Sequence, residues 1–235
     1  MAGFKTHITV SSLLGAGYGG AAYFVYGVPG PTCLLAGGLC GVSGMLPDID
    51  SDSGTPVHES MAFAAAVVPM MLIHRFQHWG LSHELIVLAG AGVYLLIRFG
   101  RAALGKRFTV HRGMFHSLPA AVIFGEIAFL LASGDDWRLR AYKAGGVVVG
   151  FLSHLVLDEI YSIQWSRGRL KNSFGTAVKL FGQGWLLNLA TYAGLALLAA
   201  AIFFEPQLSQ NPGRPGNSAS IQQAATQLID RVLHR

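Results

Sequence analysis

The stretch "LLGAGYGGAAY" (residues 13–23) combines leucine, alanine and tyrosine with closely spaced glycines and contains no charge. An uncharged apolar run predicts a helix in lipid, and small residues at close spacing let two such helices approach each other tightly. We therefore expect a membrane helix that packs through its glycines. These glycines match neither a phosphate-binding loop nor a dinucleotide-binding fingerprint.

Similar apolar segments recur along the chain, at 9–27, 31–46, 61–74, 84–98, 117–133, 143–161 and 184–204. Of the 235 residues, 52% are hydrophobic and 12% are charged, about half the charged share of a soluble domain. A bilayer core needs about 20 helical residues, so 31–46 and 61–74 are short and are expected to be tilted, re-entrant or buried by neighbours. The sequence predicts an all-α, polytopic membrane protein with about 5–7 membrane segments.

The segments form one helical membrane domain, residues 1–204, and the composition changes after it. Residues 205–220 are rich in Pro, Gly, Ser and Asn, which is typical of a linker. In 221–235 apolar residues fall near one face of a helix, which predicts an amphipathic helix for the interface or a protein partner. A loosely ordered tail is the alternative. No cleavable signal peptide is expected at the N-terminus.

The net charge of +5 would hint at nucleic acid in a soluble protein. Here most basic residues lie between apolar segments, where they orient the chain in the membrane, so no nucleic acid is predicted. Cys33 and Cys40 lie in one apolar run and are expected to be packing residues rather than a disulfide or metal ligands.

Orientation follows from Lys and Arg in the short loops. With seven spans, one side receives the larger share, namely Lys5, Arg98, Arg101, Lys106, Arg107, Arg112, Arg167, Arg169, Lys171 and Lys179. The opposite side receives Arg75, Arg138, Arg140 and Lys143 in its short loops. The positive-inside rule therefore predicts a cytoplasmic N-terminus in the cell (inner) membrane. The acidic cluster and half of the histidines fall on the same cytoplasmic side, as a site built from several helix ends requires.

The motif "SHLVLDE" (153–159) places His154 and Asp158 four residues apart, so both lie on one helix face and can bind one ion. Ionisable groups inside an apolar run are costly and are usually functional. The alternative is a structural hydrogen bond between the two side chains. We predict metal ligation by both residues.

The motif "HRGMFHS" (111–117) places His111 and His116 five residues apart. On one straight helix the two would point about 140° apart, but Gly113 permits a turn that lets both face one centre. Arg112 between them suits an anionic oxygen such as that of a phosphate. The alternative is a basic interfacial loop with two ordinary histidines.

In "GMLPDIDSDSG" (44–54) Asp48, Asp50 and Asp52 are packed closely enough to repel one another unless a cation lies among them. Asp48 and Asp50 are the predicted ligands. A solvated acidic loop is one alternative. Another is a calcium loop that adds Glu59, although its glycine, Gly54, falls one position late.

Two histidines and one serine remain. His7 begins the first apolar segment on the predicted cytoplasmic side and joins the candidate ligands, whereas a direct role for His58 is less favoured. The sequence "GVSG" (41–44) is similar to the serine motif of the rhomboid intramembrane proteases, with Ser43 as nucleophile and His154 as base. That chemistry leaves the aspartate cluster unexplained and lacks the rest of the family pattern.

An early histidine followed by "LPDID", "HRGMFHS" and "HLVLDE" resembles the YdjM-type inner-membrane family over roughly residues 1–165. The resemblance implies a metal-dependent hydrolase. The family motif usually carries Thr where this chain has Phe115. A more distant likeness is to the zinc-dependent phospholipase C and single-strand nuclease superfamily of all-helical hydrolases. The order of metal ligands in that superfamily is matched here by His7, Asp48, His154 and Asp158. No acid follows His111 or His116 by four residues, which favours one or two ions over three.

The predicted function is a membrane-embedded hydrolase that acts on a phosphoester such as a lipid headgroup. The candidate metal ligands are His7, Asp48, Asp50, His111, His116, His154 and Asp158. Mixed imidazole and carboxylate ligands suit Zn²⁺, with Mn²⁺ or Fe²⁺ as alternatives, as one or two ions. Asp50 or Asp52 would act as general base and Arg112 would bind a phosphoryl oxygen.

Three other classes of function use the same residues. An ion- or proton-coupled transporter would use the acids and histidines as a relay. A membrane scaffold would use the site structurally and recruit a protein partner through residues 221–235. A calcium sensor would need reversible calcium binding in the micromolar range or tighter.

Overall fold

The computed structural model describes residues 3–50, 55–104, 114–134, 136–164, 169–170, 178–182 and 184–209. Side chains are described for all of these except 49–50, 55–57, 101–104, 164, 169–170 and 206–209. The chain divides into two units, Met1–Ala199 and Ala200–Arg235, and helix α7 contributes to both. Everything described below as packed together belongs to the first unit.

The described chain is helical, as the sequence predicted. The α-helices are α1 (Phe4–Tyr26), α2 (Gly30–Ser43), α3 (Thr55–His78), α4 (His83–Leu104), α5 (Leu118–Leu131), α6 (Trp137–Ser162) and α7 (Trp185–Ser209). A 3₁₀ helix, η1 (Leu46–Asp50), follows α2, and the two-residue strands β1 (Ile163–Gln164) and β2 (Arg169–Leu170) pair antiparallel after α6.

Five helices are long and apolar enough to cross a membrane, over Phe4–Tyr26, His58–His78, His83–Gly100, Trp137–Ser162 and Trp185–Glu205. The chain is therefore a polytopic membrane protein. Segment α2 is short, as predicted, but the expectation of a short third segment is wrong. Helix α3 continues beyond the apolar run 61–74 into polar residues at both ends, because backbone hydrogen bonding does not stop where hydrophobicity does.

Turn and cap residues explain several of these boundaries. Gly27 ends α1 in the left-handed conformation at φ 64°, which glycine adopts without steric cost. The Ser117 hydroxyl accepts a hydrogen bond from the Ala120 N–H at the start of α5, and Asp136 caps α6 by accepting from the Arg138 N–H. Helix α7 runs to Ser209, so the first residues of the predicted linker are helical; residues 210–235 lie outside the described chain.

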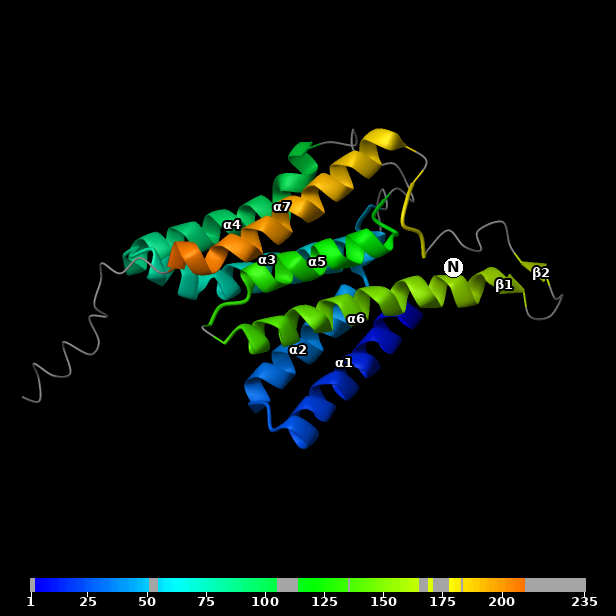
Figure 1. The fold of residues 1–235 in the computed structure, drawn as a ribbon, viewed down its shortest axis with the longest axis horizontal. Helices are drawn as coiled ribbons and strands as arrows, with labels where there is room; N and C mark the ends of the chain where they lie inside the picture. Colours follow the sequence, from blue (N-terminus) through cyan, green and yellow to red (C-terminus); the bar gives the residue numbers. More distant parts are fainter. Residues whose placement is uncertain are drawn as a thin grey trace, which may run out of the picture. The chain divides into compact units, whose positions relative to one another are not determined.

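Helices α1, α2 and α6 pack against one another, α5 packs on α6, and α3 pairs with α4 (Figure 1). A Cβ atom on Gly15 would collide with the Gly37 carbonyl, one on Gly37 would lie 2.7 Å from the Gly15 carbonyl oxygen, and one on Gly150 would collide with the Cys40 carbonyl. The predicted glycine-mediated approach of helices therefore joins α1 to α2, and the same device joins α2 to α6.

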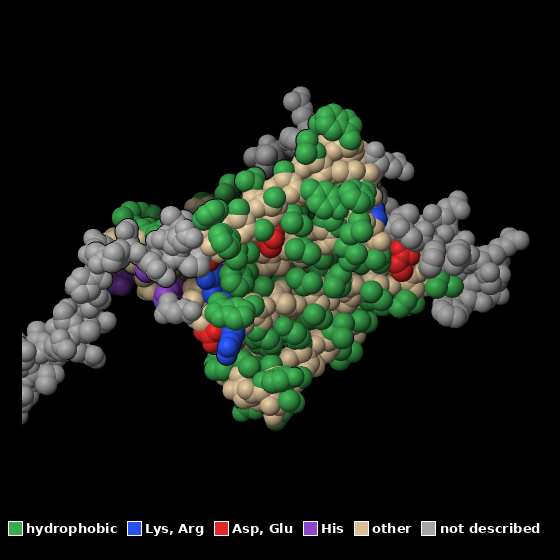
Figure 2. Space-filling view, in the orientation of Figure 1, with side chains coloured by type: hydrophobic (Ala, Val, Ile, Leu, Met, Phe, Trp, Pro, Cys, Tyr) green, Lys and Arg blue, Asp and Glu red, His purple; other side chains and the backbone are tan. Residues whose placement is uncertain are grey.

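The two cysteines are free and buried, as predicted. Figure 2 shows hydrophobic side chains over most of the face that it presents, with few charged ones. Exposed apolar residues such as Phe24 and Leu34, at 84% and 80% exposure, suit a surface that faces lipid.

Candidate metal centre

Two ligand candidates lie on the buried face of α6. His154 and Asp158 are one helical turn apart, and their residues are only 1% and 6% exposed. The His154 Nε2 atom lies 3.8 Å from Asp158 Oδ2. The spacing predicted from the sequence therefore brings both side chains to the same side of the helix, as it does in any regular α-helix.

Helix α1 brings His7 to this pair. His7 is 2% exposed, and its Nε2 atom lies 3.4 Å from Asp158 Oδ1. Its ring stacks on that of His154 with centroids 3.8 Å apart and planes inclined by 14°. His7, His154 and Asp158 each offer one ligand atom, and these atoms all lie within 4.8 Å of one another.

A second group of candidate ligands shares His154 with the first. Asp48 in η1 lies with its Oδ1 atom 3.6 Å from the Nε2 atoms of both His116 and His154. His116 is 4% exposed and precedes α5. Asp48, His116 and His154 therefore form a second group of ligand atoms within 4.8 Å, and His154 belongs to both groups.

The backbone fixes the orientation of His154. Its Nδ1 atom lies 2.7 Å from the Gly44 carbonyl oxygen, an acceptor only, so Nδ1 carries the proton and donates it. The Nε2 atom is then unprotonated in the neutral ring and points at the carboxylates of Asp48 and Asp158. A histidine that donates one ring N–H to a backbone carbonyl and presents the other nitrogen is typical of metal ligands.

The buried Nε2 atom of His154 and Nδ1 atom of His7 have no hydrogen-bond partner among the described residues. A buried lone pair facing carboxylate oxygens is unfavourable unless a cation lies between them. Ligand atoms about 2.0–2.2 Å from one tetrahedral ion stand roughly 3.3–3.6 Å apart. The imidazole–carboxylate separation of 3.4 Å in the first group and those of 3.6 Å in the second fit this spacing, and the 3.8 Å between His154 and Asp158 lies just beyond it.

The centre is open on the side of Asp48. Its side chain is 27% exposed, whereas the side chains of His154, His7 and Asp158 are 0%, 3% and 4% exposed. Burial raises the pKa of the Asp48 carboxyl, and the three facing imidazoles lower it by more, so its pKa lies below the ordinary value. Asp48 is therefore ionised near neutral pH and available as an anionic ligand.

The structure brings together five of the predicted site residues: His7, Asp48, His116, His154 and Asp158. They come from four helix ends, as predicted: the start of α1, the turn after α2, the approach to α5 and the last part of α6. The side chain of Asp50, and all of Asp52, His111 and Arg112, lie outside the described residues. Their roles stay predictions.

Two alternatives lose support from this geometry. The Ser43 hydroxyl donates to the Cys40 carbonyl at 2.9 Å, and His154 is bonded to Gly44, so no serine–histidine pair forms. Glu59 is an exposed residue of α3, whereas Asp48 faces imidazoles, which does not match a calcium loop.

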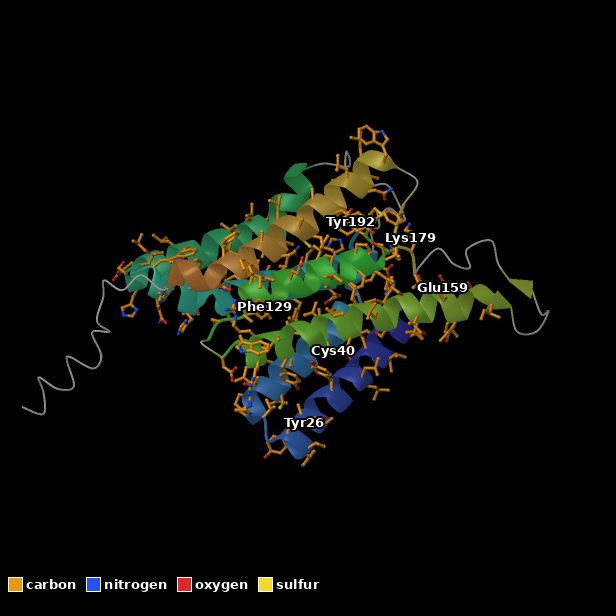
Figure 3. The ribbon with its side chains drawn as sticks, in the orientation of Figure 1. Tyr26, Cys40, Phe129, Glu159, Lys179 and Tyr192 are labelled. Carbon is orange, nitrogen blue, oxygen red and sulfur yellow. The ribbon has the colours of Figure 1, made fainter. Side chains whose placement is uncertain are left out.

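Sequence reasoning missed two features of the surroundings. The first is the Gly44 carbonyl, a backbone group that no side-chain motif predicts. The segment Val178–Gly182 lies over the start of α5, where the Leu118 N–H donates to the Lys179 carbonyl at 3.1 Å. The Val178 N–H also donates to the Glu159 carboxylate at 3.4 Å, near the end of α6 (Figure 3).

One comparison with known proteins, a match to a family model, agrees with the helical membrane fold. The sequence model of one family, described as YdjM inner membrane protein, matches residues 1–168. These residues include all five side chains of the centre and most of the helices that carry them. Searches of curated proteins and of solved structures gave no match.

Proposed function

The chain belongs to the YdjM inner membrane protein family, and we propose that it is a metal-dependent hydrolase. The site would act on a phosphoester such as a lipid headgroup. One observation carries this proposal: the Nε2 atom of His154 is buried, unprotonated in the neutral ring and without a hydrogen-bond partner in the described part of the chain, and it faces two carboxylates.

The donor set supports a single transition-metal ion. One imidazole nitrogen binds one ion, and the other nitrogen of His154 is held by Gly44, so His154 cannot bridge two ions. If three of the five described side chains, including His154, bound one ion, only two would be left to bind a second. Three imidazoles and two carboxylates suit Zn²⁺, with Mn²⁺ or Fe²⁺ as alternatives.

A bound divalent ion would supply Lewis acidity, lowering the pKa of a water towards about 7 and polarising the scissile group. Residues of the protein fix the geometry of the site. His154 is oriented by Gly44, and the buried pair of His7 and Asp158 closes its inner side. Asp48 lies on the accessible side, where a substrate would enter. Asp50 or Asp52 as general base and Arg112 as phosphate ligand complete the proposal.

A lipid phosphoester is the proposed substrate because the five side chains lie at or near helix ends, and the ends of membrane-spanning helices are where headgroups are found. The excess of Lys and Arg in the loops on the same side supports a cytoplasmic location of the centre.

Elemental mass spectrometry of detergent-purified protein tests the metal. The wild type is expected to hold about one equivalent of a transition metal, and His154→Ala and Asp48→Ala to lose it. His58→Ala is the matched control, because His58 is an exposed histidine on α3 outside both ligand groups. Wild-type protein that takes up no metal on soaking contradicts the proposal.

The activity is tested on phospholipid vesicles with the metal-loaded protein. Release of a headgroup or phosphate by the wild type but not by His154→Ala is the expected result. A metal-loaded protein that cleaves no phospholipid contradicts the lipid substrate. Ion flux in proteoliposomes without hydrolysis would favour the transporter instead.

A further inference from the structure

A groove of about 790 Å³ runs along the packed pair of helices α1 and α2. Its lining includes Ile8, Ser12, Gly20 and Phe24 from α1, Gly38 from α2 and Phe63 from α3. This volume falls within the range of about 300–1,000 Å³ that is usual for ligand sites. The lining contains no charged side chain among the described residues, so the groove suits an apolar ligand.

The groove opens on a surface that faces lipid. Helix α1 is long and apolar enough to span the membrane, and the groove residues Tyr23, Phe24 and Leu34 are 51%, 84% and 80% exposed. Because the apolar groove is continuous with a surface that faces lipid, groups of the surrounding lipid would fill it. The acyl chains of phospholipids are the apolar groups available at that position.

Helix packing explains some of the groove glycines but not all of them. Gly15 and Gly37 are required because each lies against the backbone carbonyl of the other. Gly20 and Gly38 also line the groove, yet a Cβ atom at either position would meet none of the described residues within 4 Å. Side chains at these two positions would project into open space, so they would narrow the groove without disturbing the helix contact.

One end of the groove lies at the level of the metal centre. Ile8 follows the ligand His7 directly in α1, and Gly41 is linked to α1 by the hydrogen bond from the Ser11 hydroxyl to its carbonyl, at 2.6 Å. Gly44, which orients His154, comes less than one turn after Gly41. From Ile8 to Phe24 the groove extends along α1 for roughly 24 Å at 1.5 Å per residue.

An acyl chain spans one leaflet of the bilayer core, about 15 Å, so the groove is long enough to hold one along its length. We propose that the groove binds one acyl chain of a membrane phospholipid, whose headgroup is thereby held at the level of the metal centre. This inference rests on the proposed function and deepens it, because it identifies the substrate as a lipid bound by its chain as well as by its phosphoester. The acyl chain contributes affinity for the lipid, and the position of the groove along α1 sets the position of the headgroup.

The experiment uses full-length protein in vesicles of phosphatidylethanolamine and phosphatidylglycerol that contain phosphatidylglycerol with a photoreactive diazirine in one acyl chain. The variants Gly20→Leu and Gly38→Leu narrow the groove. Gly17→Leu is the matched control, because a Cβ atom on Gly17 of α1 also meets nothing within 4 Å and Gly17 does not line the groove. After irradiation, labelled peptides are quantified by mass spectrometry.

Wild type and Gly17→Leu are expected to be labelled on α1 and α2, and labelling there should fall several-fold in both groove variants. Size-exclusion elution at the wild-type position shows that each variant is folded. Unchanged labelling in the folded groove variants overturns the inference. So does a change of oligomeric state without a change of labelling, because the groove would then bind a second copy of the chain.

The same samples separate this inference from the proposed function. Metal content is expected to stay at the wild-type level in Gly20→Leu and Gly38→Leu, and His154→Ala is expected to lose metal while keeping the label. Wild-type protein that is labelled in the groove but binds no metal contradicts the hydrolase proposal alone. Wild-type protein that binds metal but is not labelled on α1 and α2 contradicts the groove alone.

Discussion

The imidazole rings of His7 and His154 stack with their centroids 3.8 Å apart, although the two residues belong to the first and the sixth helix. Two stacked imidazolium ions would repel each other strongly in a buried site. Two neutral imidazoles stack without this repulsion, and neutral imidazole is the form that binds metals. The stack joins α1 to α6 beside the ligand atoms of His7, His154 and Asp158.

His7→Ala is expected to weaken metal binding by at least about tenfold, since loss of a group that only supports a ligand already costs 10–100-fold. Isothermal titration of metal-free protein with Zn²⁺ measures the effect. Thr6→Ala, one residue away, is the control. Equal affinity of His7→Ala and wild type would remove His7 from the ligand set.

Asp158→Asn is expected to lower metal content because it removes an anionic ligand while keeping the size of the side chain. Glu159→Gln is the matched control, since Glu159 is the adjacent acid but belongs to neither ligand group. Elemental analysis of both variants after identical purification distinguishes them. A similar loss of metal in both would point to a general effect of charge rather than to coordination by Asp158.

Metal retention is expected to fall as the pH drops into the mildly acidic range, because protons compete with the metal for the imidazole nitrogens. Asp48 does not set this transition, because its lowered pKa keeps its carboxylate ionised throughout the range. Dialysis at stepped pH followed by elemental analysis gives the midpoint. Asp48→Asn should weaken binding at every pH and move the midpoint to higher pH, because protons displace a weakly held metal more easily. An unchanged midpoint would contradict ligation by Asp48.

Gly150→Ala is expected to destabilise the protein by about 1–3 kcal/mol, since an added methyl group would overpack the contact of α6 with the Cys40 carbonyl and the Ser43 hydroxyl. Thermal unfolding in detergent, followed by circular dichroism, measures the change. Gly92→Ala in α4 is the control, because its Cβ atom would meet nothing within 4 Å. Equal unfolding temperatures for the two variants would show that α2 and α6 do not depend on this close approach.

The fold was largely predictable because hydrophobicity is a local property of the sequence. The apolar runs located every α-helix of the described chain to within several residues. The errors lie at helix ends, as in α3, which extends into polar residues, and in α7, which runs on to Ser209. Cap residues and the backbone hydrogen bonds that they complete, rather than hydrophobicity, decide where a helix stops.

The sequence by itself determined the class of protein, the chemistry-bearing residue types and one local pair, His154 and Asp158, because helical periodicity relates residues four apart. Only the tertiary structure decided which distant residues join that pair. The packing of α1, α2 and α6 through Gly15, Gly37 and Gly150 sets the depth and rotation of each helix, and no local pattern encodes these. The same packing places the Gly44 carbonyl against His154, because a backbone acceptor is present at every residue and only the fold selects one.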